Sequence, residues 1–286
     1  MVPMEKIQQS ESEAHMIEDK EGIVYEEFEV VNFKRENNTV KLEDGIKKVI
    51  VEVSLKIIVN GMELVSLLCL NEYQEELALG FLYNEGVINS LNDIKSIEYN
   101  ERMQAVIIEL AEGITIDRQE SLRSITSGCG KCYTYINPLK RTSFTPSTST
   151  STYSVSQIMS IMKDFIEQSE IYNTIGGVHS VLFYSEDLKL VAEDIGRHNC
   201  FDKVTGMLMK HNKMQLAENG VIFISGRLTS EMMTKMIRLK TPLVVSKSTP
   251  STATVRLARQ YNITILGYVL GHKGIIYSCP ERITTP

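Results

Sequence analysis

The chain has 286 residues, of which 43% are hydrophobic, so it is long enough to form one large domain or two of ordinary size. Its formal net charge of −6 argues against a protein that binds nucleic acid over its whole surface, but permits a local basic pocket for one phosphorylated ligand. No apolar run reaches the ~18 residues of a membrane span, and residues 1–22 lack the apolar core of a signal peptide. Five cysteines in so long a chain favour a reducing compartment. We therefore expect a cytoplasmic protein with no membrane segment and no nucleic-acid partner.

The first half of the chain predicts a small, mostly β domain over residues 23–141, preceded by a disordered acidic tail over residues 1–22. Asn60-Gly61 lies between two runs rich in apolar residues and is a strong hairpin signal. The expected elements are strands over 24–33, 49–59, 62–70, 94–99 and 105–110, and one helix over 75–86.

Residues 142–156 are rich in Ser and Thr and show no apolar period, so we interpret them as a linker. Strands and helices alternate over residues 157–286. The expected helices cover 155–167, 200–210, 230–239 and 253–261, and the expected strands cover 180–184, 188–192, 220–225, 243–246, 263–268 and 274–278. This alternation predicts an α/β layer with a largely parallel sheet, in which ligands bind beyond the carboxyl ends of the strands.

Cys129 and Cys132 form a Cys-x-x-Cys pair in the segment S-G-C-G-K-C. Such a pair is typical of half a zinc site, of a dithiol redox pair, or of a nucleophile that carries sulfur. A zinc site needs two more ligands, and the sequence has no second Cys-x-x-Cys and no closely spaced His pair. Glycines beside Cys129 suggest an exposed loop, and Lys131 favours a thiolate. The residues leave all three interpretations open, with the loop nucleophile slightly ahead.

Three expected strand-to-helix loops each carry a cation. These are E-D-I-G-R-H-N with Arg197 and His198, S-G-R-L-T-S-E with Arg227, and S-K-S-T-P-S-T with Lys247. Any one of them alone is better explained as a capped helix start, with Thr229 or Ser230 as the cap of one helix. Because all three would meet at one edge of a parallel sheet, together they predict a site for a phosphate-bearing ligand.

Two further segments contain a histidine beside glycine. Gly176-Gly177-Val178-His179 precedes a strand, where His179 is either a ligand-binding residue or, more commonly, a core histidine. The turn Tyr268-Val269-Leu270-Gly271-His272-Lys273 places an aromatic ring near a histidine and a lysine, which suits stacking on a base and contact with phosphate. A plain hairpin turn is the simpler interpretation of the second segment.

Taken together, these segments resemble the FdhD family, the sulfurtransferases required for formate dehydrogenase. The resemblance runs in order from about residue 50 to Arg282, and E-D-I-G-R-H-N is its most specific element. It implies an α/β (α+β overall) fold with a cytidine-deaminase-like C-terminal layer. It also implies a persulfide on Cys129, with Cys132 as its companion, and a homodimer. Cys200 departs from the family pattern, and we expect it to be a buried helix thiol.

The resemblance further implies that sulfur comes from a cysteine desulfurase and passes to the molybdenum cofactor with two pterins and guanine dinucleotides, destined for a formate dehydrogenase. The cofactor would contact Tyr268–Lys273, and His179, Arg197, His198, Arg227 and Lys247 would add binding groups. No permanently bound metal is expected. The alternative is a chaperone that binds the cofactor without covalent chemistry. A zinc deaminase is disfavoured, because the chain lacks both H-x-E and P-C-x-x-C.

Overall fold

The computed structural model describes residues 15–16, 22–114, 122–125, 133–136 and 144–285. Most of the expected acidic tail, and both cysteines of the Cys-x-x-Cys segment, lie outside these residues. Within the described part, β8 (Leu122–Ile125) pairs antiparallel with β9 (Tyr133–Ile136). None of the described helices is long and apolar enough to cross a bilayer.

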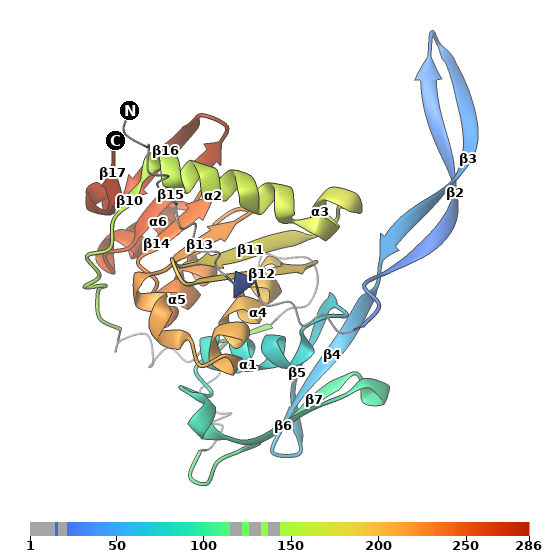
Figure 1. Ribbon diagram of the computed structural model, residues 1–286. Helices are drawn as coiled ribbons and strands as arrows, with labels where there is room; N and C mark the ends of the chain where they lie inside the picture. Colours follow the sequence, from blue (N-terminus) through green and yellow to red (C-terminus); the bar gives the residue numbers. More distant parts are fainter. Residues whose placement is uncertain (1–14, 17–21, 115–121, 126–132, 137–143, 286) are drawn as a thin grey trace, which may run out of the picture.

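A seven-stranded sheet forms the centre of the C-terminal half (Figure 1). Its spatial order is β1 (His15–Met16), β12 (Leu188–Asp194), β11 (His179–Tyr184), β13 (Val221–Ile224), β14 (Leu243–Ser246), β15 (Thr264–Leu270) and β16 (Lys273–Ser278). The expected α/β layer is confirmed. The largely parallel sheet is wrong, because β11 runs antiparallel to both β12 and β13, and β16 runs antiparallel to β15. The short link between β11 and β12 requires this hairpin, since a parallel pair needs a long crossover. β12, β13, β14 and β15 nevertheless all point the same way.

Helices cover both faces of this sheet. α2 (Val155–Gln168) begins at Ser154, whose hydroxyl accepts the Gln157 N–H at 3.1 Å. Its apolar residues Ile158, Ile161, Met162 and Phe165 recur at helical spacing and pack on one face of the sheet. α4 (Arg197–Lys210), α5 (Ser230–Leu239) and α6 (Thr252–Gln260) pack on the other face. The core is therefore two apolar layers separated by the sheet.

The N-terminal half contributes a second, four-stranded sheet, in the order β5 (Met62–Leu70), β4 (Glu52–Val59), β7 (Ala105–Leu110) and β6 (Ile94–Asn100). The predicted Asn60-Gly61 turn is confirmed, with φ of 49° and 75°. α1 (Gln74–Asn84) packs directly on α4 at two glycines. A Cβ added to Gly80 would lie 1.7 Å from the Asp202 carbonyl oxygen, and one added to Gly206 would lie 1.9 Å from that of Glu76. Only glycine permits this close crossing of the two helices.

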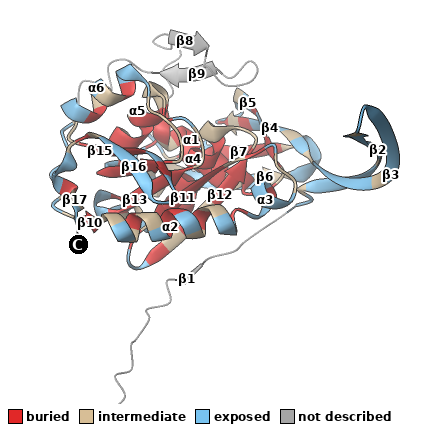
Figure 2. Cartoon of the chain, turned by 90° about the horizontal axis from the view of Figure 1, so that it is seen from above, coloured by how far each residue is buried: buried red, intermediate tan, exposed pale blue. Residues whose placement is uncertain are grey.

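The expected single strand over 49–59 is wrong. The run divides at Val51 between β3 (Thr39–Ile50) and β4, which belong to different sheets. Among the described strands, β3 pairs with β2 (Tyr25–Glu36) alone, through a turn in which Asn37 and Asn38 have φ of 45° and 66°. This hairpin, called the arm below, projects away from the rest of the molecule (Figure 1) and is almost wholly exposed (Figure 2).

Residues 144–152 lie against the C-terminal half as an extended segment. The Ser147 N–H donates to the Tyr261 carbonyl at 2.9 Å, and the Ser149 hydroxyl donates to Asn219 at 3.0 Å. α2 begins inside the expected linker of residues 142–156, and the domain boundaries stay a prediction. Short elements that the sequence pattern did not indicate are α3 (Glu170–Thr174), β10 (Tyr153–Ser154), β17 (Ile283–Thr284) and 3-10 turns at Leu91–Asp93, Glu101–Met103, Met214–Asn219 and Pro280–Arg282.

Candidate functional site

The carboxyl ends of β12, β13 and β14 converge at one edge of the central sheet. At that edge His179 is paired with Asp194 across the β11–β12 ladder. The Ser180 N–H donates to the Ser225 hydroxyl at 2.9 Å, which joins the start of β11 to the loop after β13. The Ser246 hydroxyl donates to the Gly226 carbonyl at 2.8 Å and joins that loop to the one after β14. The expected meeting of the three loops at one edge is therefore present in the fold.

His179 lies at the centre of this edge and is partly buried. A Cβ on Gly226 would lie 3.1 Å from the His179 Nδ1, so the glycine leaves room for the ring. Burial lowers the pKa of His179, and the positive charges of Arg197 and Arg227 lower it further. The Asp194 carboxylate acts in the opposite direction but does not reverse the shift, so the imidazole is neutral near pH 7.

The segment that carried the resemblance contains a buried charge network. Asp194 and Lys203 form a fully buried ion pair, with 2.8 Å between Asp194 Oδ2 and Lys203 Nζ. Asp194 also accepts the N–H of Leu70 at 3.1 Å, the N–H of Gly196 at 2.9 Å and the side-chain amide of Asn199 at 2.8 Å. Burial lowers the pKa of Lys203, but neighbouring carboxylates, with Asp194 foremost, more than compensate and raise it overall. These residues hold the loop and β5 together.

Arg197 and His198 open α4, immediately after this network, and both are partly buried. His198 Nε2 lies 3.2 Å from a carboxylate oxygen of Glu231 in α5. Burial lowers the pKa of His198 despite this carboxylate, and the histidine in turn lowers the pKa of Glu231. His198 thus links the first turns of α4 and α5, while the nearby Asp194 carboxylate already accepts the Gly196 N–H at the helix start.

The other two predicted cations lie on neighbouring loops. Arg227 is exposed between β13 and α5, where the Thr229 hydroxyl caps the helix as expected. The Lys247 ammonium donates to the Tyr172 hydroxyl at 3.4 Å and lies 5.3 Å from the centre of its ring. Tyr172 was missed by sequence reasoning, because it belongs to the five-residue α3, which has no clear periodic signal.

The residues of the predicted turn Tyr268–Lys273 lie in different surroundings, with Tyr268 to Leu270 at the end of β15 and Lys273 at the start of β16. Tyr268 is exposed at φ 52°, and its N–H donates to the Ser248 carbonyl at 2.9 Å, beside the Lys247 loop. Val269 is buried under α2, so its side chain is part of the core. Leu270, Gly271 and His272 line a cavity of about 530 Å³ against α2, and Lys273 is exposed. Only the Tyr268 end of the turn therefore lies next to the cationic loops.

Cys129 and Cys132 lie outside the described residues, so the structure does not place them. Of the described cysteines, Cys69 and Cys200 are fully buried. Burial raises the pKa of Cys69 to about 12 and that of Cys200 well above its ordinary value. The expectation that Cys200 is a buried helix thiol is confirmed. Neither thiol is suited to act as a nucleophile.

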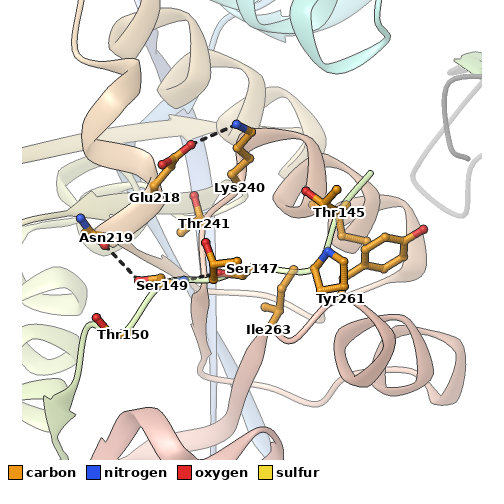
Figure 3. A pocket seen from close by; sticks show the side chains of 13 residues that line it. Thr145, Ser147, Ser149, Thr150, Glu218, Asn219, Lys240, Thr241, Tyr261 and Ile263 are labelled. Carbon is orange, nitrogen blue, oxygen red and sulfur yellow. Dashed lines mark hydrogen bonds and ion pairs between the residues drawn. The ribbon is translucent and has the colours of Figure 1, made fainter. Parts of the chain in front are cut away.

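A separate pocket of about 290 Å³ lies at the opposite end of the strands (Figure 3). Residues 145–150 form one wall, and Asn219, Thr241 and Ile263 come from the segments that lead into β13, β14 and β15. Lys240 and Glu218 form an ion pair of 3.0 Å at this pocket (Figure 3). It therefore shares none of the predicted site residues. Within the described residues, no group of three or more His, Cys, Asp and Glu is arranged to hold a metal ion.

The fold and the site define a class: an α/β protein whose strand ends present several cations and a neutral histidine at one edge of the sheet. Residues 50–284 match the sequence model of the FdhD/NarQ family, and the chain belongs to that family. It is 35% identical over 252 residues to the sulfur carrier protein FdhD of Bacillus subtilis, and the alignment covers 85% of this chain and 92% of the relative. It is 33% identical over 243 residues to the sulfur carrier protein FdhD of Bacillus pumilus, and that alignment covers 83% of this chain and 90% of the relative.

A similar fold occurs in the crystal structure of a candidate formate dehydrogenase accessory protein from Desulfotalea psychrophila. The TM-score is 0.73 at 22% sequence identity, and the match covers 92% of this chain and 100% of that one. The similarity in fold thus extends over nearly the whole chain, including the N-terminal sheet.

Proposed function

We propose that this chain is a sulfur carrier that accepts sulfur as a persulfide on Cys129 and delivers it to a molybdenum cofactor bearing guanine dinucleotides. The donor would be a cysteine desulfurase, and the final recipient a formate dehydrogenase. Family membership and the names of the relatives support the sulfur-carrier role. The Cys129 persulfide, the desulfurase donor, the cofactor and the recipient dehydrogenase are proposed from the family resemblance. The homodimer is proposed on the same ground.

The observation that carries the cofactor part of the proposal is the position of Arg197 and Arg227 near His179, with Lys247 on the adjoining loop after β14. Guanidinium and ammonium groups recognise phosphate through charge-assisted hydrogen bonds. Cations that come from separate loops of one sheet edge suit a ligand with phosphates at several positions, such as a dinucleotide. The neighbouring Tyr268 ring offers a surface on which a base can stack.

The sulfur step needs one nucleophile and no external oxidant. The Cys129 thiolate attacks the terminal sulfur of a persulfide on the donor. A new sulfur–sulfur bond forms at Cys129, the donor's sulfur–sulfur bond breaks, and the donor leaves as a thiolate. Delivery breaks the sulfur–sulfur bond at Cys129, which leaves as a thiolate, and forms a bond from the terminal sulfur to the cofactor; the two electrons that convert this sulfur to sulfide would come from a thiol reductant or from the reduced cofactor.

Intact-mass spectrometry after incubation with a cysteine desulfurase and cysteine tests the carrier. We expect a reductant-sensitive gain of one sulfur in the wild type and in Cys132→Ala, and none in Cys129→Ala. Equal labelling of the wild type and Cys129→Ala would move the role to another cysteine. No labelling of any protein would favour the alternative, a chaperone that binds the cofactor without covalent chemistry.

Binding of GDP, measured by calorimetry, tests the cationic edge separately. We expect Arg197→Ala and Arg227→Ala each to weaken binding by at least about tenfold, since a lost charge-assisted hydrogen bond is worth ~1.5–3 kcal/mol. Arg102→Ala is the matched control, because Arg102 is exposed in the turn between β6 and β7. Unchanged affinity in both edge variants would show that the ligand binds elsewhere.

A further inference from the structure

The pocket at the end of the strands away from the cationic edge has walls from separate parts of the chain (Figure 3). The extended segment 145–150 forms one wall, and residues just before β13, β14 and β15 form the others. Its volume of about 290 Å³ lies at the lower end of the range for small-molecule sites. A ligand of this pocket is therefore about the size of a single ring, and it binds apart from the proposed cofactor site.

Hydrogen bonds hold the extended segment against the loops that it faces. The Ser147 N–H donates to the Tyr261 carbonyl at 2.9 Å, and the Asn262 side-chain amide donates to the Ser147 carbonyl at 2.8 Å. Two residues further on, the Ser149 hydroxyl donates to the Asn219 side chain at 3.0 Å. The loops that lead into β13 and β15 therefore fix this wall of the pocket in position.

Thr241 forms part of the pocket wall where α5 leads into β14, and it is fully buried. Its N–H donates to the Met236 carbonyl at 3.2 Å, which fixes its backbone at the end of the helix. Its hydroxyl, in contrast, has no hydrogen-bond partner among the described residues. Most buried hydroxyls in folded proteins are paired, because an unpaired one loses the hydrogen bonds that it made in water. The Thr241 hydroxyl therefore offers a hydrogen bond to a molecule bound in the pocket.

The polar lining of the pocket is mostly hydroxyl and carries no net charge. Among the described residues that line it, the charged ones are Glu218 and Lys240, which pair with each other at 3.0 Å (Figure 3). A hydroxyl both donates and accepts hydrogen bonds, so a row of hydroxyls suits a ligand that does the same. The hydroxyl-bearing residues of the extended segment are Thr145, Ser147, Thr148, Ser149 and Thr150.

Apolar groups complete the lining. Ile237 and Ile263 are buried at the pocket, and Tyr261 contributes its aromatic ring (Figure 3). Aromatic and aliphatic side chains remove apolar ligand surface from water but offer no charge to an ion. The lining as a whole therefore fits a neutral molecule that has several hydroxyl groups and also an apolar C–H face.

We propose that this pocket binds a neutral single-ring sugar, a pentose or a hexose. The hydroxyls of the sugar hydrogen-bond to Thr241 and to the segment 145–150, and its C–H face packs on Ile263 and the Tyr261 ring. Because a ligand of about a dozen non-hydrogen atoms makes few contacts, we expect dissociation constants in the millimolar range. The proposal does not depend on the sulfur-carrier function.

Saturation-transfer NMR of the full chain with D-ribose and with D-glucose tests for binding. We expect a saturable signal from at least one of the two sugars and none from cyclohexanol, which has a similar ring but a single hydroxyl. Amide shifts in the ¹⁵N-labelled protein should change at residues 145–150 and at Thr241, and should stay constant at Arg197 and Arg227. Binding of cyclohexanol as strong as that of the sugars would overturn the proposed ligand class, and shifts confined to the cationic edge would overturn the site.

Thr241→Val tests the role of the buried hydroxyl, since valine has the same shape. We expect it to weaken sugar binding about three- to tenfold, as one neutral hydrogen bond is lost. Its melting temperature should not fall, because the removed hydroxyl has no partner in the fold. Thr39→Val is the matched control, because Thr39 is exposed in the arm and takes no part in the pocket.

Three results would overturn the proposal. The first is a wild type that binds neither sugar over the millimolar range. The second is a Thr241→Val protein that binds sugar as well as the wild type and the Thr39→Val control do. The third is a Thr241→Val protein with a clearly lower melting temperature, since the hydroxyl would then serve the fold rather than a ligand.

Discussion

Replacing Asp194 with Asn should destabilise the fold strongly, because the Asp194 carboxylate forms an ion pair of 2.8 Å with the fully buried Lys203. The substitution removes the negative charge that faces the ammonium. It also points an amide NH₂ into a site where the N–H groups of Leu70 and Gly196 need acceptors. Removing one member of a buried ion pair costs ~3–5 kcal/mol. At ~2 °C or more per kcal/mol for a domain of this size, the melting temperature should fall by at least about 6 °C.

Equilibrium unfolding in urea and thermal unfolding followed by circular dichroism measure this effect. A double-mutant cycle with Lys203→Met isolates the pair, and the double variant should lose less than the sum of the two single losses. Glu218→Gln is the control, because its ion pair with Lys240 is exposed and worth less than ~1 kcal/mol. If Asp194→Asn costs less than about 1 kcal/mol, the network does not hold the loop and β5 together as argued.

Three further predictions follow from the packing and the pKa values. Burial and Arg197 hold the pKa of His179 below its ordinary value of 6.5, so its contribution to stability is complete above that pH and is lost as the pH falls through the lowered pKa. GDP bound at the edge should raise this pKa in an NMR titration, and an unchanged pKa would contradict phosphate binding there. Gly206→Ala should cost ~1–3 kcal/mol of unfolding free energy, because the new Cβ meets the Glu76 carbonyl at 1.9 Å; a neutral result would mean that α1 and α4 separate without cost. Iodoacetamide at pH 8 should leave Cys69 and Cys200 unmodified in the folded protein by mass spectrometry, and rapid modification of either would contradict their burial.

The sequence predicted most helices and strands of the C-terminal half, because each is marked by an apolar period within a few residues. The helix over 155–167 and the strand over 243–246 each follow from a period within a few residues, and the structure confirms both with ends shifted by a residue or less. The sequence did not predict the arm as a hairpin, because the local signals for its turn and for its end are weak. Its turn uses Asn37-Asn38 rather than Asn-Gly, and the run from Val49 to Val59, rich in β-branched residues, gives no sign that the chain changes sheet at Val51.

The direction of β11 was also beyond local reasoning. A strand that follows a helix is consistent with either direction, and only the short link to β12 favours a hairpin. The meeting of the three loops at one edge could be expected because β12, β13 and β14 point the same way, and the binding roles of their cations stay a prediction. The sequence around Tyr268–Lys273 did not reveal that the Val269 side chain is buried in the core under α2.

The polar residues of E-D-I-G-R-H-N and of the helix that follows divide into two groups with different surroundings. Asp194, Asn199 and Lys203 are buried, and Asn199 donates to the Leu68 carbonyl while Asp194 accepts from Leu70, so both hold β5 of the N-terminal sheet. Arg197, between them in sequence, is left at the sheet edge beside His179. The segment from Asp194 to Lys203 therefore holds the N-terminal sheet and the cationic edge in one arrangement.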